Sequence, residues 1–130
     1  MSHHRETITA LGAPKAAGPY SHAVRSGGFL FLSGQVPLDP ETAQLIDGSP
    51  ADQLRRCLDN LAVVAAAGGA QLTDAVRVAV YVTDLSVGPE VNEAYTAYFQ
   101  QDPPARTMIG VAALPLGAQI EVDAILALPD

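Results

Sequence analysis

The sequence predicts an α+β fold in which a mixed β-sheet carries two helices on one face. Three observations predict it. Six apolar segments bounded by turn residues read as strands, and two segments with helical periodicity interrupt them to give the order β-β-β-α-β-α-β-β. Several strands are apolar on both faces, although two helices can cover only one. We therefore expect another subunit to cover the second face.

Three strands are expected before the first helix. Residues 6–11 read as a short edge strand, and residues 21–25 and 29–33 flank Ser26-Gly27-Gly28. Paired glycines favour a tight hairpin because they adopt positive φ readily. Alternation along the third strand places Leu30 and Leu32 on one face, and Phe29, Phe31 and Ser33 on the other.

Two helices are expected between the strands. Ser49 is a plausible N-cap with Pro50 in the first turn, and Gly68-Gly69 ends this helix. The second helix opens at Pro89 and stops at Asp102-Pro103-Pro104. The buried stripe of the first helix consists of Leu54, Leu58, Leu61 and Ala65, with Cys57 beside it as a small buried hydrophobe.

Strands are also expected at 76–83, 105–112 and 118–127, and we expect the last two to pair as a hairpin. Arg106 and Glu121 would then lie near each other across the ladder. Both charges sit among apolar neighbours, where a charge is costly unless it is paired or used. A cation that binds an anion, next to a carboxylate that handles a proton, would begin an active site.

The composition limits the classes of function. A chain of 130 residues with 48% apolar residues is expected to form one domain, residues 1–130. Its net charge of −7 disfavours a nucleic-acid binder. A single cysteine, no apolar signal segment in residues 1–12 and no apolar run of about 20 residues predict a cytoplasmic protein without membrane contact.

Short motifs spread over residues 7–128 resemble, as an ordered set, the RidA family, the YjgF-type reactive-intermediate deaminases. The resemblance implies a chorismate-mutase-like fold, assembled as a homotrimer with clefts between subunits. The motifs are Gly18-Pro19-Tyr20-Ser21, Ser33-Gly34-Gln35, Asn60-Leu61, Val91-Asn92-Glu93-Ala94-Tyr95, Pro104-Ala105-Arg106-Thr107, Ala113-Leu114-Pro115 and Ile120-Glu121-Val122.

The resemblance also implies an activity, that of a 2-iminobutanoate/2-iminopropanoate deaminase. Such enzymes hydrolyse reactive enamines and imines, chiefly 2-aminoacrylate and 2-aminocrotonate, to 2-keto acids and ammonia. The partner is a small substrate that bears a carboxylate, and no metal or organic cofactor is implied.

By the same resemblance, Arg106 and the backbone N–H of Met108 would bind the substrate carboxylate, and Glu121 would polarise the attacking water. Family members often carry cysteine at the position of Met108, but a backbone contact tolerates that departure. The remaining residues that would form the cleft or its rim are Tyr20, Ser33, Gly34 and Asn92.

Structural alternatives stand beside these roles. Arg106 could simply bridge Glu121 or Asp123, and Glu121 could belong to a solvated strand face. Tyr20 could serve packing alone, and Ser33 could cap a strand end. We interpret a further polar residue, His22, as structural although it is close to Tyr20 in the sequence.

Three other functions remain open at this stage. A pathway-specific relative would act on another enamine, such as 3-aminoacrylate. A ligand-sensing or chaperone-like module would bind small carboxylates without turnover. An endoribonuclease is disfavoured by the acidic composition and the lack of a basic patch.

Overall fold

The structure is a computed structural model that describes residues 4–130; residues 1–3, part of the segment expected to lack a secretion signal, lie outside it. The described chain forms strands and helices in the predicted order. These are β1 (Glu6–Ile8), β2 (Ala23–Ser26), β3 (Phe29–Gln35), α1 (Pro50–Ala67), β4 (Ala75–Val82), α2 (Gly88–Tyr98), β5 (Ala105–Gly110) and β6 (Ile120–Ala127).

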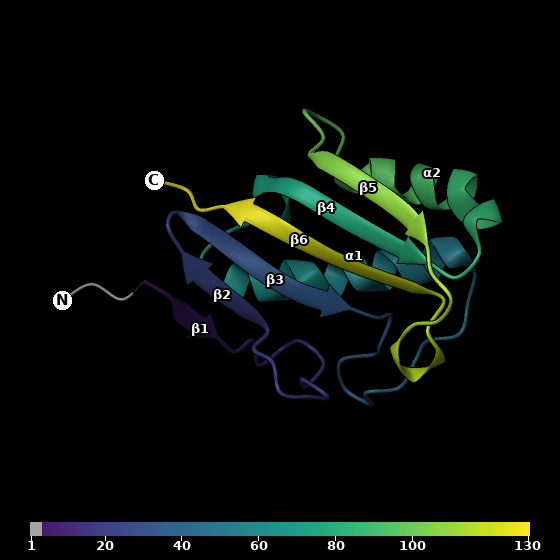
Figure 1. Cartoon of the computed structure of the whole chain (residues 1–130), viewed down its shortest axis with the longest axis horizontal. Helices are drawn as coiled ribbons and strands as arrows, with labels where there is room; N and C mark the ends of the chain where they lie inside the picture. Colours follow the sequence, from purple (N-terminus) through teal and green to yellow (C-terminus); the bar gives the residue numbers. More distant parts are fainter. Residues whose placement is uncertain (1–3) are drawn as a thin grey trace.

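One mixed sheet organises the molecule. Its strands follow the order β1-β2-β3-β6-β4-β5, in which β4 and β5 are parallel and the other neighbours are antiparallel. In Figure 1, α1 runs behind the middle of the sheet and α2 lies beside it near β5. The predicted α+β architecture, with both helices on one face of a mixed sheet, is confirmed.

The expected hairpin between the last two strands is wrong. Both strands form, but β4 lies between them and pairs with each. The cause is the crossover through α2, because a helical connection returns the chain parallel to the strand that it left. The connection from β5 to β6 then passes the end of β4, where the Val111 N–H donates to the Val82 carbonyl at 2.8 Å.

The β2–β3 hairpin forms as predicted. Gly27 and Gly28 take φ values of 59° and 84°, which most other residues avoid. Beyond the turn, Leu30 is completely buried against the helices, whereas Phe29 and Phe31 remain 41% and 43% exposed on the opposite face. We call this opposite face, which carries Phe29, Phe31 and Ile109, the open face of the sheet.

Capping hydrogen bonds stabilise the start of helix α1, and burial of its apolar stripe stabilises the rest of it. The Ser49 hydroxyl accepts from the Asp52 N–H, and the Asp52 carboxylate accepts from the Ser49 N–H, so two free donors of the first turn are satisfied. Cys57 is buried beside the stripe, and burial raises the pKa of its thiol, which therefore stays protonated and unreactive. All four predicted stripe residues are fully buried: Leu54, Leu58, Leu61 and Ala65.

Helix α2 is tied to α1 at the molecular surface. The Tyr98 hydroxyl donates to the Asp59 carboxylate at 2.8 Å, and burial, followed by this bond, raises the pKa of Tyr98 to about 12. Because α2 is held in place, so is β5, which follows it. No helix within residues 4–130 combines the length and apolar character needed to span a membrane.

Candidate active site

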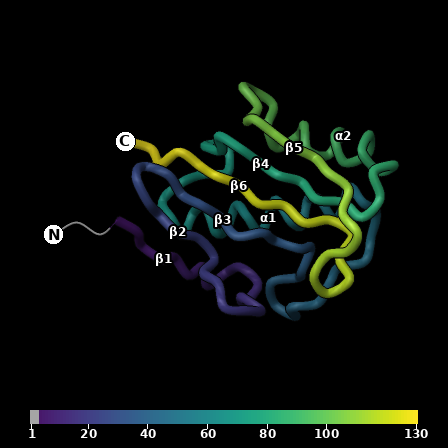
Figure 2. Tube along the Cα trace, in the orientation of Figure 1, coloured from purple at the N-terminus to yellow at the C-terminus, as the bar shows by residue number. Residues whose placement is uncertain are grey.

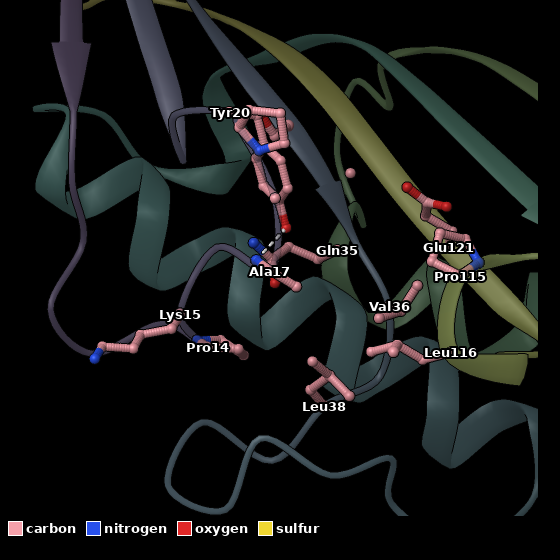
Figure 3. Close-up of a pocket in the computed structure, with 14 residues that line it drawn as sticks. Pro14, Lys15, Ala17, Tyr20, Gln35, Val36, Leu38, Pro115, Leu116 and Glu121 are labelled. Atoms are coloured by element: carbon pink, nitrogen blue, oxygen red, sulfur yellow. Dashed lines mark hydrogen bonds between the residues drawn. The ribbon is translucent and has the colours of Figure 1, made fainter.

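A cavity of about 450 Å³ opens where three connecting segments gather at one end of the sheet. Figure 2 shows these segments along the lower edge of the molecule, before β2, after β3 and before β6. Figure 3 shows the lining side chains. They are Pro14, Lys15, Ala17, Gly18, Pro19, Tyr20, Ser33, Gly34, Gln35, Val36, Leu38, Pro115, Leu116 and Glu121.

Glu121 supplies the carboxylate of this cavity. Alternation along β6 turns it toward the open face, directly opposite Tyr81 of β4. It lies against Gly34, where a Cβ atom would come within 2.0 Å of the Glu121 Oε2. Burial, and secondly the charge of Asp123, raise the pKa of Glu121. A carboxylate with raised proton affinity is a stronger general base than one in water.

Gly34 makes this approach possible. The register of β3 against β6 shifts between Leu32 and Gln35, so the strand bulges where Gly34 faces the carboxylate. The Glu121 carboxylate therefore lies closer to the Gly34 backbone than a residue with a Cβ atom would allow. Two distant parts of the sequence, β3 and β6, meet here to shape one wall of the cavity.

Tyr20 and Ser33 form part of the same cavity. The Tyr20 side chain is 47% exposed, and its hydroxyl oxygen accepts a hydrogen bond from the Ala17 N–H at 3.2 Å. The Ser33 hydroxyl donates to the Ser21 carbonyl at 2.6 Å, which fastens the Tyr20 loop to β3. Ser33 thus ties the Tyr20 loop to β3 and also lines the cavity.

The buried His22 side chain holds the Tyr20 loop through two hydrogen bonds to the backbone. Its Nδ1 accepts from the Ala10 N–H at 2.9 Å, and its Nε2 lies 2.8 Å from the Pro14 carbonyl. An acceptor at Nδ1 and a donor at Nε2 define one neutral tautomer of the ring. These bonds agree with the structural interpretation of His22 and fix the segment that carries Tyr20.

Arg106 lies outside this cavity, on the helix-covered side of β5 and against α2. Its Nη1 donates to the Asn92 Oδ1 at 2.7 Å, and its guanidinium carbon is 4.8 Å from the centroid of the Tyr95 ring. An amide and an aromatic ring therefore orient the guanidinium while leaving most of its N–H groups free for an anion. The alternative in which Arg106 bridges Glu121 or Asp123 within one chain is wrong, because Arg106 bonds to Asn92.

The strand register separates the two charged groups. Arg106 is level with Val78, whose side chain is buried on the helix side of the sheet. Glu121 is level with Tyr81, three residues further along β4, and therefore faces the opposite side. The expected proximity of Arg106 and Glu121 within one chain is thus wrong. Tyr20, Ser33, Gly34 and Glu121 share the cavity, whereas Asn92, Arg106 and Met108 do not line it.

No sequence motif pointed to several of the residues that line this cavity. Val36, Leu38 and Leu116 line the cavity, but they belong to irregular connections whose path depends on tertiary contacts. Tyr95 was detectable in principle, because it follows Asn92 by three residues and so lies on the same side of α2. Within residues 4–130, no group of three or more His, Cys, Asp or Glu side chains is placed to hold a metal ion.

Residues 10–128 match the sequence family described as Endoribonuclease L-PSP, which includes the RidA-type proteins. The chain belongs to this family. The match spans every strand of the sheet except β1 and includes all of the residues proposed above for the site.

Similar RidA-family proteins include both enzymes and solved structures. The 2-iminobutanoate/2-iminopropanoate deaminase of Mus musculus is 40% identical over 121 residues, which cover 93% of this chain and 90% of that protein. RidA from an Antarctic Psychrobacter superposes with a TM-score of 0.91 at 38% identity, over 95% of this chain and 99% of the other. E. coli TdcF with bound serine superposes with a TM-score of 0.88 at 32% identity, over the same shares of the two chains.

Proposed function

We propose that this protein is a 2-iminobutanoate/2-iminopropanoate deaminase, which hydrolyses small α-imino acids and their enamine tautomers to 2-keto acids and ammonia. The observation that carries the proposal is the Glu121 carboxylate, half-buried in a largely apolar cavity with a raised pKa. The name of the mouse relative supports the same reaction. So does the serine in TdcF, a small ligand that bears a carboxylate beside an amine-bearing carbon.

The reaction needs one positioned water and one proton acceptor. Glu121 takes a proton from the water as the water oxygen bonds to the imine carbon, and the imine nitrogen takes a proton from solvent. The nitrogen of the resulting carbinolamine then receives the proton held by Glu121, the hydroxyl releases its proton to solvent, and the carbon–nitrogen bond breaks. Ammonia and a 2-keto acid leave, and Glu121 is a carboxylate again. General-base help of this kind contributes about 10²–10⁴-fold to the rate.

Arg106 would hold the substrate carboxylate. Its planar guanidinium can donate two parallel hydrogen bonds to a carboxylate. Asn92 and Tyr95 hold the guanidinium in place before the substrate binds. Met108 follows on the same strand, and β5 is an edge strand with backbone groups that β4 does not use. A backbone N–H of Met108 is therefore available as a second donor in our proposal.

We further propose that each complete site lies between two copies of the chain, in a homotrimer. Arg106 and Glu121 face opposite sides of one sheet, so a single copy cannot present both to one small substrate. The open face, with exposed Phe29, Phe31 and Ile109, offers the apolar surface that such an assembly would bury. In the trimer, Glu121 of one copy meets Arg106 of the next.

The family description names an endoribonuclease, but the charge of this chain favours a small-molecule substrate. A net charge of −7 opposes the approach of an RNA backbone, which binds through several Lys and Arg contacts. We therefore propose no nucleic-acid partner and, from the single cysteine, a cytoplasmic location.

A coupled assay tests this function. A serine/threonine dehydratase generates the enamine, and the release of pyruvate or 2-oxobutanoate is followed with and without this protein. Arg106→Lys keeps the charge but loses the two-pronged contact, so we expect kcat/KM to fall about 10- to 100-fold, as for the loss of one hydrogen bond to a charged group.

The matched control is Arg55→Lys, because Arg55 lies on the exposed surface of α1 and outside the cavity. This control should keep wild-type activity. If the wild-type protein fails to accelerate keto-acid release at any concentration of dehydratase, the proposed function is wrong.

A further inference from the structure

Two features of Leu116 make leucine an unfavourable residue for the stability of the fold at this position. Its backbone takes φ 62° and ψ 14°, a left-handed conformation that leucine rarely adopts. Its side chain is also 61% exposed, so it contributes little to the core. A glycine at this position would relieve the backbone and expose less apolar surface. Residues kept in unfavourable conformations concentrate at ligand sites.

The surroundings of Leu116 are those of a binding wall. It lines the cavity together with Val36, Leu38 and Pro115, and Figure 3 shows its side chain directed toward Val36 and Leu38. Glu121 stands in the same cavity, five residues further along the chain. A substrate whose reacting carbon is near Glu121 would therefore extend its side chain toward an apolar surface. Such a side chain would bury the exposed surface of Leu116.

The cavity is also larger than the smallest substrates need. A three-carbon imino acid has six heavy atoms, which at the volume of liquid water would occupy roughly 200 Å³. The cavity in a single copy of the chain holds about 450 Å³, part of which the Arg106 side chain of a neighbouring copy would occupy in the proposed assembly. The remaining space lies beside apolar side chains, so water in it has few partners and an apolar group displaces that water favourably.

From this arrangement we infer that Leu116 is a specificity-determining residue, and that the site takes α-imino acids with an aliphatic side chain of about four carbons at least as well as the three-carbon imine. The inference rests on the proposed function, because it uses the same cavity and the same hydrolysis. The suppliers of such substrates are enzymes that oxidise branched or long aliphatic amino acids to their imines. The products are the corresponding 2-keto acids and ammonia.

The kinetic test compares two imines on the same preparations. An amino-acid oxidase generates the imine of alanine or of leucine in situ, and keto-acid release is measured against oxidase alone. Wild-type protein should show a kcat/KM for the leucine imine that equals or exceeds that for the alanine imine. Leu116→Ala and Leu116→Gly should lower the first value about tenfold or more and the second less than about twofold, because lost apolar contacts to a substrate cost about 10–200-fold.

Ala43→Gly is the matched control for the backbone. Ala43 also has a positive φ, 60°, but it does not line the cavity. Its substitution relieves the same kind of conformation and should leave the ratio of the two kcat/KM values unchanged. A ratio in Leu116→Ala within about twofold of the wild-type ratio would overturn the inference, as would a wild-type preference of tenfold or more for the alanine imine.

A binding measurement separates this inference from the proposed function. Calorimetry with 4-methyl-2-oxopentanoate and with pyruvate requires no turnover, and Leu116→Ala should weaken the first about tenfold and the second little. If wild-type protein hydrolyses neither imine, the proposed function fails. If it hydrolyses the alanine imine but Leu116→Ala changes neither selectivity nor the binding of the larger keto acid, only the role of Leu116 fails.

Discussion

At the scale of single residues, the candidate site depends on two charged groups that the fold places in different environments. Arg106 is exposed and held by Asn92 and Tyr95, so its guanidinium is oriented without being neutralised. Glu121 is half-buried in the cavity, and burial raises its pKa. In the proposed mechanism, Arg106 binds the substrate carboxylate and Glu121 accepts a proton, which are the two tasks that imine hydrolysis requires.

Replacing Glu121 by Gln should abolish the base while keeping the shape of the cavity. We expect kcat to fall about 10²–10⁴-fold. Wild-type activity should also decline on acidification at a higher pH than an ordinary glutamate would give, because the raised pKa leaves Glu121 protonated there. A pH–rate profile from pH 4 to 9 checks both points. An acid limb that persists unchanged in the residual activity of Glu121→Gln would assign that ionisation to another group.

The same substitution should stabilise the fold. A raised pKa means that folding disfavours the charged form of Glu121, and this penalty is fully present above the folded-state pKa and absent below about pH 4.5. Glu121→Gln should therefore raise the Tm at pH 8, and the gain should vanish as the pH falls to 4. Thermal melts at the two pH values measure it. A lower Tm at pH 8 would show that the charge stabilises the folded state.

At the scale of elements, the site depends on irregularities rather than on regular strands. The bulge at Gly34 admits the Glu121 carboxylate, and the loop fastened by His22 closes the facing wall. Both features are local, so each can be changed without rebuilding the sheet.

Gly34→Ala should remove activity with little loss of stability. The new methyl group would meet the Glu121 Oε2 at 2.0 Å, and the flexible end of that side chain would move aside. We expect kcat to fall at least about tenfold, because a base displaced by about 1 Å loses its alignment with the water. Gly88→Ala, where the added Cβ meets only the Met108 Sδ at 4.0 Å, is the control. Equal activities of the two variants would contradict the role of Gly34.

His22→Leu should loosen the Tyr20 loop. It removes the partners of the Ala10 N–H and the Pro14 carbonyl, and two lost hydrogen bonds together cost about 2 kcal/mol of unfolding free energy. We also expect KM to rise more than kcat falls, because the loop lines the cavity without carrying the base. His22→Asn, whose side-chain oxygen can still accept from Ala10, should recover part of both. Urea denaturation and steady-state kinetics measure the effects, and wild-type values in His22→Leu would contradict them.

The sequence predicted the elements far better than their pairing. Capping residues, the α1 stripe and the Gly27-Gly28 turn are local signals, and each element that they predict forms. The insertion of β4 between β5 and β6 is a long-range choice that no local pattern encodes. For the same reason the candidate site residues were proposed individually by resemblance, but their division between two faces of the sheet was not foreseen.

At the scale of the whole molecule, the division of the site is the central feature. One end of the sheet carries the Glu121 cavity, and the α2 edge carries Arg106, on the opposite side of the same sheet. The open face exposes Phe29, Phe31 and Ile109, and this apolar surface is available for contact with another copy of the chain. Assembly of identical copies in a closed ring would bury this face and supply each cavity with a guanidinium from a neighbour.

Mixing two inactive variants tests this account most directly. Arg106→Ala keeps Glu121, and Glu121→Gln keeps Arg106, so co-refolded mixtures would contain sites with both native residues. Random exchange in a cyclic assembly should restore about a quarter of wild-type activity, because one interface in four then joins the two intact halves. Native mass spectrometry confirms the exchange. Mixed trimers no more active than the parent variants would contradict a site shared between copies.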